Sequence, residues 1–314
     1  MPGFAVHYLF GEETINNYDN DLVRKSVDRY RDVYNLGLQG PDLFFYFFIS
    51  PVFFKKNVGS IMHRIDIGLF KKNYIELLDR IDDREKSMIA LSYFAGFIGH
   101  CTLDKICHPY VYAVTDYAHK DKNYFAKHVE LETEIDSIYI KKYKDIDLYG
   151  FNCRDTVNLD NAEIDVVAEI FSQAVTKTYT DVSLSKNMMI FVIRFYLFFL
   201  NIFKDKCGIK KKIVSIVERF ILRKQLISPL FVEREIEIKY DDPVNIGNNQ
   251  WISPWETDII RIESFDELFS KAVLEYNKVL SEINSYLENN DKEILKLSIE
   301  NISLHSGLDC SIPS

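Results

Sequence analysis

The stretch GHCTLDKICHP at residues 99–109 contains the pattern His-x-x-x-Asp-x-x-x-His. On an α-helix, positions i, i+4 and i+8 share one face, so His100, Asp104 and His108 would project in the same direction. Residues 91–98, just before them, are apolar nearly all round, which is typical of a buried helix. Buried imidazole and carboxylate groups need partners, and both are common zinc ligands. The stretch therefore predicts a metal site; a polar cluster satisfied within the core is the alternative.

Further residues of the same types indicate more than one metal ion. His128 and Glu132 repeat the i, i+4 spacing, and Asp42 follows a Gly-Pro turn. With Asp104, the candidates outnumber the four ligands of one tetrahedral zinc site. We therefore expect two or three metal ions, with Asp104 as the carboxylate that bridges them. Six of the seven histidines lie within the first 128 residues: His7, His63, His100, His108, His119 and His128.

Several of these candidates have a plain structural alternative. His7 is either a ligand or a histidine of the core, and Asp42 is either a ligand or the N-cap of a helix after the proline. His119 lies in a polar loop and is a rival ligand at the second site. On the helix of His128, a solvated face is expected for Glu130, Glu134 and Asp136.

Composition favours a large helical protein. The chain has 314 residues, of which 47% are hydrophobic, so it can bury a sizeable core. The low numbers of glycine (12) and proline (8) disfavour a turn-rich β sandwich or barrel. We expect an all-α fold and a single domain over residues 1–314, with metal ligands within 1–135 and a helical extension over about 180–314. The net charge of −9 argues against nucleic acid as a broad, charge-driven partner, although a local basic patch stays open.

The sequence favours a cytoplasmic protein. The N-terminus lacks the basic region, long apolar run and cleavage site of a signal peptide. The apolar stretches 43–54 and 188–203 are shorter than the roughly 20 residues that span a membrane. An odd number of cysteines without framework spacing indicates reduced thiols. The cysteines are Cys101, Cys107, Cys153, Cys207 and Cys310.

Apolar periodicity predicts a series of helices. Pro109 is expected to end the helix that carries the opening stretch. Ser264 and Glu267 form a capping box at the start of a later helix. Residues 110–123 and 225–262 are expected to be irregular. The predicted helices cover residues 20–35, 57–82, 85–107, 124–143, 162–178, 186–203, 204–224, 264–288 and 291–302.

The order of these residues resembles a known family. The chain runs His, Asp, His, then His-x-x-x-Asp-x-x-x-His, then His-x-x-x-Glu. This order is similar to the bacterial zinc-dependent phospholipase C family, which includes the catalytic domain of clostridial alpha-toxin. The resemblance covers residues 1 to about 135 by motif and the rest by helical character alone. The stretches at 35–42 and 99–109 resemble a clostridial branch other than the secreted toxins. The resemblance implies an all-α bundle shared with the single-strand-specific zinc nucleases.

The resemblance also implies roles for individual residues. It makes Asp42 the general base as well as a ligand. It divides the ligands among three zinc sites, of which the third includes the N-terminal group of the chain. The first site would use Asp42, His63, His100 and Asp104, the second His108, His128 and Glu132, and the third His7 and Asp104.

Four features depart from the family pattern. The spacing from Asp104 to His108 is shorter than usual in the phospholipases, and the gap from Asp42 to His63 is longer. The chain starts Met-Pro, whereas the secreted enzymes start with a tryptophan whose amine and carbonyl bind zinc. The membrane-binding β domain of alpha-toxin has no counterpart. The shortened spacing and the missing N-terminal tryptophan support an alternative without catalysis, in which the protein keeps the fold and binds metal structurally or has lost a site.

The functional hypothesis is a zinc-dependent phosphodiester hydrolase of phospholipase C type. In it a zinc-activated water attacks a phospholipid-type phosphodiester. A single-strand nuclease or nucleotidase on the same fold is the second alternative. Besides the phospholipid or other phosphodiester substrate, the expected partner is a membrane surface contacted through 188–224, where an apolar helix precedes a basic one. A buried helix beside a solvated one is the plain reading of that segment. No obligate protein partner is expected.

Overall fold

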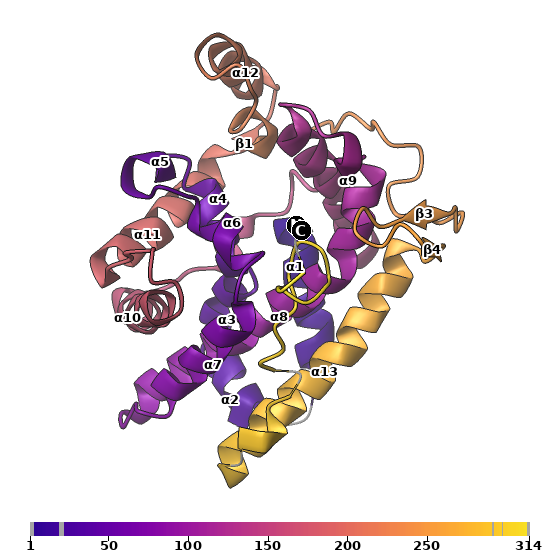
Figure 1. Ribbon diagram of the computed structural model, residues 1–314. Coiled ribbons are helices and arrows are strands. Elements are labelled where there is room, and N and C mark those ends of the chain that lie inside the picture. The colour runs from indigo at the N-terminus through magenta and orange to yellow at the C-terminus, as the bar shows by residue number, and fades with distance from the viewer. Residues whose placement is uncertain (1–2, 19–21, 291, 297, 313–314) are drawn as a thin grey trace.

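The computed structural model describes residues 3–18, 22–290, 292–296 and 298–312, and it confirms the all-α prediction. Figure 1 shows the helices gathered around α8 (Arg84–Val114), which packs against helices from both halves of the chain. The helices that precede it are α1 (Phe4–Asn16), α2 (Leu22–Arg29), α3 (Arg31–Gly37), α4 (Leu43–Tyr46), α5 (Ser50–Phe53), α6 (Val58–Met62) and α7 (Ile67–Leu78).

The remaining helices surround α8, and the few strands are short. Strands β1 and β2 pair in parallel, and β3 and β4 pair antiparallel. These elements are α9 (Tyr124–Lys144), α10 (Asn161–Thr178), α11 (Lys186–Ile202), β1 (Lys204–Asp205), α12 (Ile209–Ile221), β2 (Val232–Glu233), β3 (Trp251–Ile252), β4 (Ile260–Arg261) and α13 (Phe265–Asn289). Single 3-10 turns are η1 (Gly40–Asp42), η2 (Tyr117–His119), η3 (Cys153–Thr156), η4 (Ser228–Leu230) and η5 (Lys292–Ile294).

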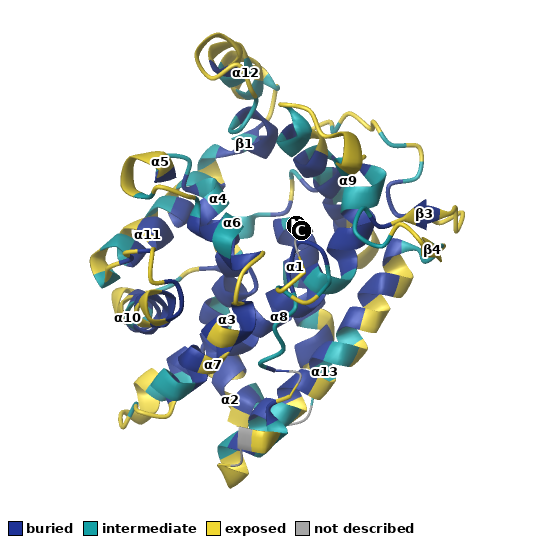
Figure 2. Ribbon diagram, viewed as in Figure 1, coloured by how far each residue is buried: buried dark blue, intermediate teal, exposed yellow. Residues whose placement is uncertain are grey.

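Helix α8 is the buried axis of the molecule. It starts at Asp83, whose carboxylate accepts the backbone N–H groups of Glu85 and Lys86. From residue 89 onward, Figure 2 shows it dark along most of its length, as the apolar run predicted. One main core reaches from α1 to α13, where Phe10 and Tyr276 stack with ring centroids 5.4 Å apart.

Two glycines bring α3 into backbone contact with α8. A Cβ added at Gly37 would lie 2.3 Å from the carbonyl oxygen of Tyr93, and one at Gly96 would lie 2.1 Å from that of Tyr34. The two helices can therefore cross this closely only where side chains are absent. The contact holds the chain that follows α3, including η1, against the turn of α8 that carries His100.

Some predicted helix boundaries are wrong. Pro109 lies inside α8 instead of ending it, because a proline removes one helical hydrogen bond while the burial of Tyr110 and Val111 holds the next turn in place. The predicted helix 57–82 is interrupted just after α6, where Asp66 adopts a left-handed conformation with φ of 49°. The break ends α6 at His63 and turns that side chain toward α8.

Three further boundaries differ from the prediction. The predicted helix 20–35 divides into α2 and α3, and the predicted helix 204–224 starts only after Gly208, which has φ of 68°. Within 291–302, η5 is the one helical turn of the described residues. There the backbone N–H of Ser298 bonds to Glu282 instead of to a helical carbonyl.

None of the helices in the described parts of the chain combines the length and the apolar character needed to cross a bilayer. The cysteines are all free thiols, as predicted.

Candidate metal centre

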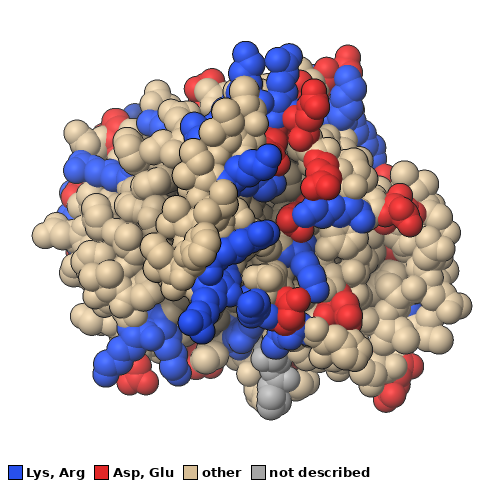
Figure 3. Space-filling view, turned by 90° about the horizontal axis from the view of Figure 1, so that it is seen from above, with Lys and Arg blue, Asp and Glu red and all other residues tan. Residues whose placement is uncertain are grey.

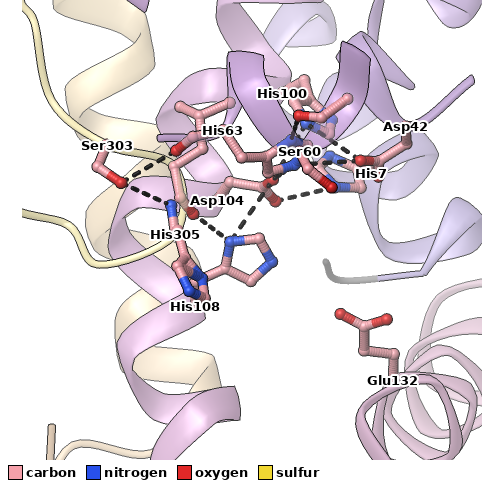
Figure 4. Close-up of polar contacts among 12 residues, drawn as sticks. His7, Asp42, Ser60, His63, His100, Asp104, His108, Glu132, Ser303 and His305 are labelled. Carbon is pink, nitrogen blue, oxygen red and sulfur yellow. Dashed lines mark hydrogen bonds and ion pairs between the residues drawn. The ribbon is translucent and has the colours of Figure 1, made fainter. Parts of the chain in front are cut away.

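Four predicted ligands converge on the second half of α8. Asp42 comes from η1, His63 follows α6, and His100 and Asp104 lie on successive turns of α8 (Figure 4). One donor atom from each lies within 4.8 Å of the other three. His100 Nε2 is 3.0 Å from Asp104 Oδ2, and His63 Nε2 is 3.2 Å from Asp42 Oδ1. All four side chains are buried.

Backbone carbonyls orient the two histidines of this first group. His63 Nδ1 bonds to the carbonyl of Gly59 at 2.7 Å, and His100 Nδ1 bonds to that of Leu38 at 3.1 Å. A carbonyl oxygen can only accept, so each Nδ1 carries the proton. Each Nε2 therefore presents a lone pair to the site, which is how metal-binding histidines are usually held.

The first group fits a bound cation. Asp104 Oδ2 lies 3.0 Å from His100 Nε2 and 3.4 Å from His63 Nε2, so carboxylate and imidazole lone pairs face each other. Among the described residues, no N–H or O–H is aimed at these two nitrogens or at either oxygen of Asp104. Buried acceptors in mutual contact are unfavourable unless a cation lies between them. Imidazole nitrogens and carboxylate oxygens are the donor set that zinc accepts.

Protons compete with a metal ion for the ligand atoms of the first group. Burial lowers the pKa of His63, but the neighbouring carboxylates of Asp104 and Asp42 outweigh it and raise the pKa to about 9. Burial alone would raise the pKa of Asp104, yet His100 and His108 bring it well below its usual range. Asp104 is thereby kept in the anionic form that binds metal.

His108, His128 and Glu132 form the second group, with donor atoms within 4.8 Å of one another. His108 lies one turn beyond Asp104 on α8, while the other two come from α9; Figure 4 shows Glu132 facing the α8 residues from that helix. His128 Nε2 is 2.8 Å from Glu132 Oε1. Burial lowers the pKa of both histidines well below the usual range and raises that of Glu132.

Asp104 lies between the two groups. One of its oxygens is 3.7 Å from His108 Nδ1 and also contacts the first group. The His63 and His108 rings have centroids 6.1 Å apart. The predicted common face of His100, Asp104 and His108 is therefore real, but its two histidines belong to different groups.

His7 contacts the first group from α1. Its Nε2 is 3.2 Å from Asp104 Oδ1, and its ring stacks on His100 with centroids 4.4 Å apart. Burial and then His100 lower its pKa. The N-terminal group predicted to join it lies outside the described residues. The rival ligand His119 is exposed on η2 and pairs with Asp116 at 2.8 Å, so it belongs to neither group.

The turn that presents Asp42 depends on Gly40. Its φ is 49°, in the left-handed region, and an added Cβ would lie 2.3 Å from the His100 ring. Asp42 occupies the N-cap position of α4, as the alternative expected, but its side chain makes no capping bond and lies 3.2 Å from His63 Nε2 instead.

Two carboxylates expected on a solvated face are buried instead. Asp136 accepts the backbone N–H groups of Ala5 at 3.1 Å and Val6 at 2.9 Å. Glu134 accepts the N–H of Lys239 at 2.8 Å. The prediction was wrong because these carboxylates satisfy backbone groups of segments far away in sequence. Asp136 thereby holds the start of α1, and with it His7, against α9.

A C-terminal segment completes the site, and the sequence analysis missed it. Ser303 Oγ and the backbone N–H of His305 both donate to the carbonyl of His63, at 3.0 and 3.2 Å (Figure 4). The carbonyl of Leu304 accepts from His108 Nδ1, which fixes the tautomer of that ring. The one available signal was His305 itself, the single histidine outside the N-terminal cluster.

Two cavities adjoin the ligand groups. The larger, of about 250 Å³, is bounded by His63, His108, His128 and Glu132 and by aromatic side chains. The smaller, of about 90 Å³, reaches Asp42 and Glu132 and has mostly apolar walls. The walls of the smaller cavity include Phe45, Tyr46, Phe125, Leu148, Phe151 and Phe203.

Comparison with known proteins agrees with this chemistry. The family described as zinc dependent phospholipase C matches residues 6–180, more than half of the chain. The matched range contains all seven residues of the two ligand groups and His7. No curated protein and no solved structure matched the chain. Because the family match includes a buried donor set that suits zinc, we conclude that the chain belongs to the zinc-dependent phospholipase C family.

Proposed function

We propose that the protein is a zinc-dependent phosphodiester hydrolase that acts on phospholipids. The observation that carries this proposal is the pair of buried ligand groups, with Asp104 between them, at the wall of two aromatic cavities. Adjacent metal sites are typical of phosphate-ester hydrolysis. The apolar walls suit a substrate with a lipid portion.

The proposed zinc ligands are those of the two groups, with a third ion as an extension. When bound, zinc polarises the phosphoryl oxygens, neutralises developing charge and lowers the pKa of a water molecule toward neutrality. Asp42, His63, His100 and Asp104 would hold the first ion, His108, His128 and Glu132 the second, and His7 with Asp104 a third.

The protein's own side chains orient these donors and handle the proton. The carbonyls of Gly59, Leu38 and Leu304 fix the tautomers of the histidines, so the donors are held before metal binds. Asp42 lines the smaller cavity, and we assign it as the general base that takes a proton from the attacking water. The apolar walls there exclude bulk water from that carboxylate.

The test is hydrolysis of short-chain phospholipids with several headgroups by the zinc-loaded protein. We expect release of diacylglycerol, loss of turnover with a chelator, and recovery when zinc is returned. Asp104→Asn should lower kcat/KM at least about a hundredfold, since even residues that only support ligands cost 10–100-fold. Asp165→Asn, which changes an exposed carboxylate on α10, should have no effect.

Three results would contradict the proposal. Less than one zinc per chain in the purified protein would exclude both the phospholipase and the nuclease on this site. Release of mononucleotides from single-stranded DNA, with every phospholipid untouched, would favour the nuclease alternative. Zinc binding without either activity would favour the non-catalytic one.

We also propose that α12 contacts an anionic phospholipid surface. Within this helix, Glu218 is the one buried residue, whereas Ile213, Phe220 and Ile221 are 57%, 83% and 73% exposed. Figure 3 looks down on the α12 end of the molecule and shows a band of Lys and Arg side chains across this face, with several Asp and Glu side chains beside it. An exposed apolar stripe flanked by basic residues is typical of helices that lie in the membrane interface.

The two acidic residues of the segment 188–224, Asp205 and Glu218, point inward. Asp205 accepts the backbone N–H of Lys211 at 2.8 Å, and Glu218 accepts those of Leu226 and Ser228 at 2.9 and 3.0 Å. Their negative charges are therefore directed at the protein. The Lys210 and Lys211 amines also bond to protein acceptors, whereas Lys212 and Arg219 of α12 are exposed. This arrangement complements anionic headgroups and favours the membrane reading of 188–224 over a merely solvated helix.

A further inference from the structure

The outer wall of the larger cavity carries two cations. Arg64, directly after the ligand His63, and Lys120, after η2, both line it, together with three tyrosines. Apart from the proposed ligand Glu132, the described residues of this wall include no carboxylate. The cavity therefore offers positive charge beside His305 and Tyr117, which both contact Tyr112 near the C-terminal end of α8.

Neither cation forms an ion pair with a carboxylate among the described residues. A guanidinium N–H of Arg64 donates to His305 Nε2 at 3.0 Å, and the hydroxyl of Tyr117 lies 3.1 Å from the same nitrogen. Lys120 Nζ lies over the Tyr117 ring, 3.8 Å from its centroid. The nearby carboxylate of Asp116 is engaged with His119.

This arrangement fixes the cations without neutralising them. Because His305 accepts the bond at Nε2, it is an uncharged imidazole, and the charge of Arg64 stays available to a ligand. His305 is itself held by its backbone bond to the carbonyl of His63. An arginine that is oriented by a neutral acceptor is well placed for bidentate binding of a phosphate.

We propose that Arg64, Lys120 and Tyr117 bind a second anionic group on the substrate, so that the preferred phospholipid has a phosphorylated headgroup. This inference rests on the proposed phospholipase function. A trimethylammonium headgroup would need open aromatic faces and suffers repulsion from nearby cations. Here Lys120 occupies the face of Tyr117. A phosphomonoester would instead pair with both cations and accept a hydrogen bond from the tyrosine hydroxyl.

The test compares two short-chain lipids below their micelle concentrations, which removes any contribution of α12 to surface binding. The zinc-loaded protein should hydrolyse dihexanoyl phosphatidylinositol 4-phosphate with a higher kcat/KM than dihexanoyl phosphatidylcholine. Arg64→Met and Lys120→Met should each lower the ratio of the two values about tenfold or more, as expected for lost charge-assisted hydrogen bonds. Arg64→Lys should restore part of the preference.

The matched control is Lys122→Met, which removes an exposed charge beside Lys120 that does not line the cavity. It should leave the ratio unchanged. A preference for phosphatidylcholine would overturn the subsite while leaving the phospholipase function intact. So would a ratio of the two kcat/KM values that neither Arg64→Met nor Lys120→Met alters.

If the wild-type protein hydrolyses neither lipid, the phospholipase function fails and the subsite is decided by binding. Calorimetric titration with inositol 1,4-bisphosphate should then show binding that Arg64→Met and Lys120→Met abolish and Lys122→Met retains. Absence of binding to the wild-type protein, or equal binding by all variants, would overturn the subsite as well.

Discussion

Gly40 shows how closely the ligand arrangement depends on a single residue. Its left-handed backbone and the 2.3 Å approach of a virtual Cβ to the His100 ring leave no room for a side chain. We expect Gly40→Ala to lower the free energy of unfolding by about 2 kcal/mol or more and to reduce bound zinc. Thermal unfolding and metal analysis measure the two effects.

Gly247→Ala is the control for this prediction, since its φ is not left-handed and its added Cβ would meet side chains alone, Asn249 at 3.1 Å and Asp242 at 3.5 Å. Wild-type stability and zinc content in Gly40→Ala would show that the turn before Asp42 can shift without loss of the site.

The raised pKa of Asp136 leads us to expect that the free energy of unfolding depends on pH. Burial raises its pKa to about 7, although the N–H groups of Val6 and Ala5 lower it in part. The pKa of an unfolded aspartate is about 3.9, so the folded state binds the proton more tightly. Stability should therefore decrease as pH rises from about 4 to about 7, by up to about 4 kcal/mol, and then level off.

The measurement compares wild type with Asp136→Asn by urea unfolding at a series of pH values. The asparagine cannot ionise, so the difference in unfolding free energy between the two proteins should change steadily over that interval in favour of the variant. A difference that stays constant between pH 4 and pH 7 would contradict a raised pKa at this carboxylate.

At the scale of elements, α12 is where the membrane proposal can be tested. Because Phe220 and Ile221 are 83% and 73% exposed, replacing both with serine should leave the fold intact. Burying such side chains in a lipid interface contributes about 1.5–3 kcal/mol each, so vesicle binding should weaken at least about tenfold. Sedimentation with anionic vesicles measures the binding.

Turnover of a monomeric short-chain lipid serves as the internal control for this variant and should not change. Equal sedimentation of the variant and the wild type would show that α12 is simply a solvated helix, as the plain reading of 188–224 has it.

Periodicity predicted most helices but not where they break. The apolar run before His100 and the capping box at Ser264 are local signals, and α8 and α13 follow them. The passage of α8 through Pro109 is held by tertiary burial, which outweighs local propensity, and the break after His63 follows from the left-handed backbone of Asp66. The break matters for the site, because it turns the His63 side chain toward Asp104.

At the scale of the whole molecule, the site draws on segments from both ends of the chain. Spacing brought His100, Asp104 and His108 onto one face and singled out His128 and Glu132. The family resemblance divided these residues, with Asp42 and His63, between two sites. Neither could reveal that Leu304 fixes the tautomer of His108 or that His305 orients Arg64. Those contacts depend on how the irregular C-terminal segment folds back, for which local sequence carries no periodic signal.

This convergence predicts that zinc stabilises the fold as well as the site. Without zinc, the ligand atoms of His63, His100 and Asp104 meet in the core, and a proton at His63, whose pKa is raised to about 9, offsets this only in part. Zinc at a thousand times its Kd would add about 4 kcal/mol of stability. For a chain of this size, chelation should then lower Tm by on the order of 10 °C.

Differential scanning calorimetry with and without a chelator measures this shift, and returning zinc should reverse it. Asp104→Asn is the informative companion, because it removes a carboxylate of the first group that also lies 3.7 Å from His108, so its Tm should respond less to the chelator than that of the wild type. If the chelator removes the zinc and the wild-type Tm does not change, the metal binds elsewhere, since a cation between these buried acceptors cannot be removed without destabilising the helices that carry them.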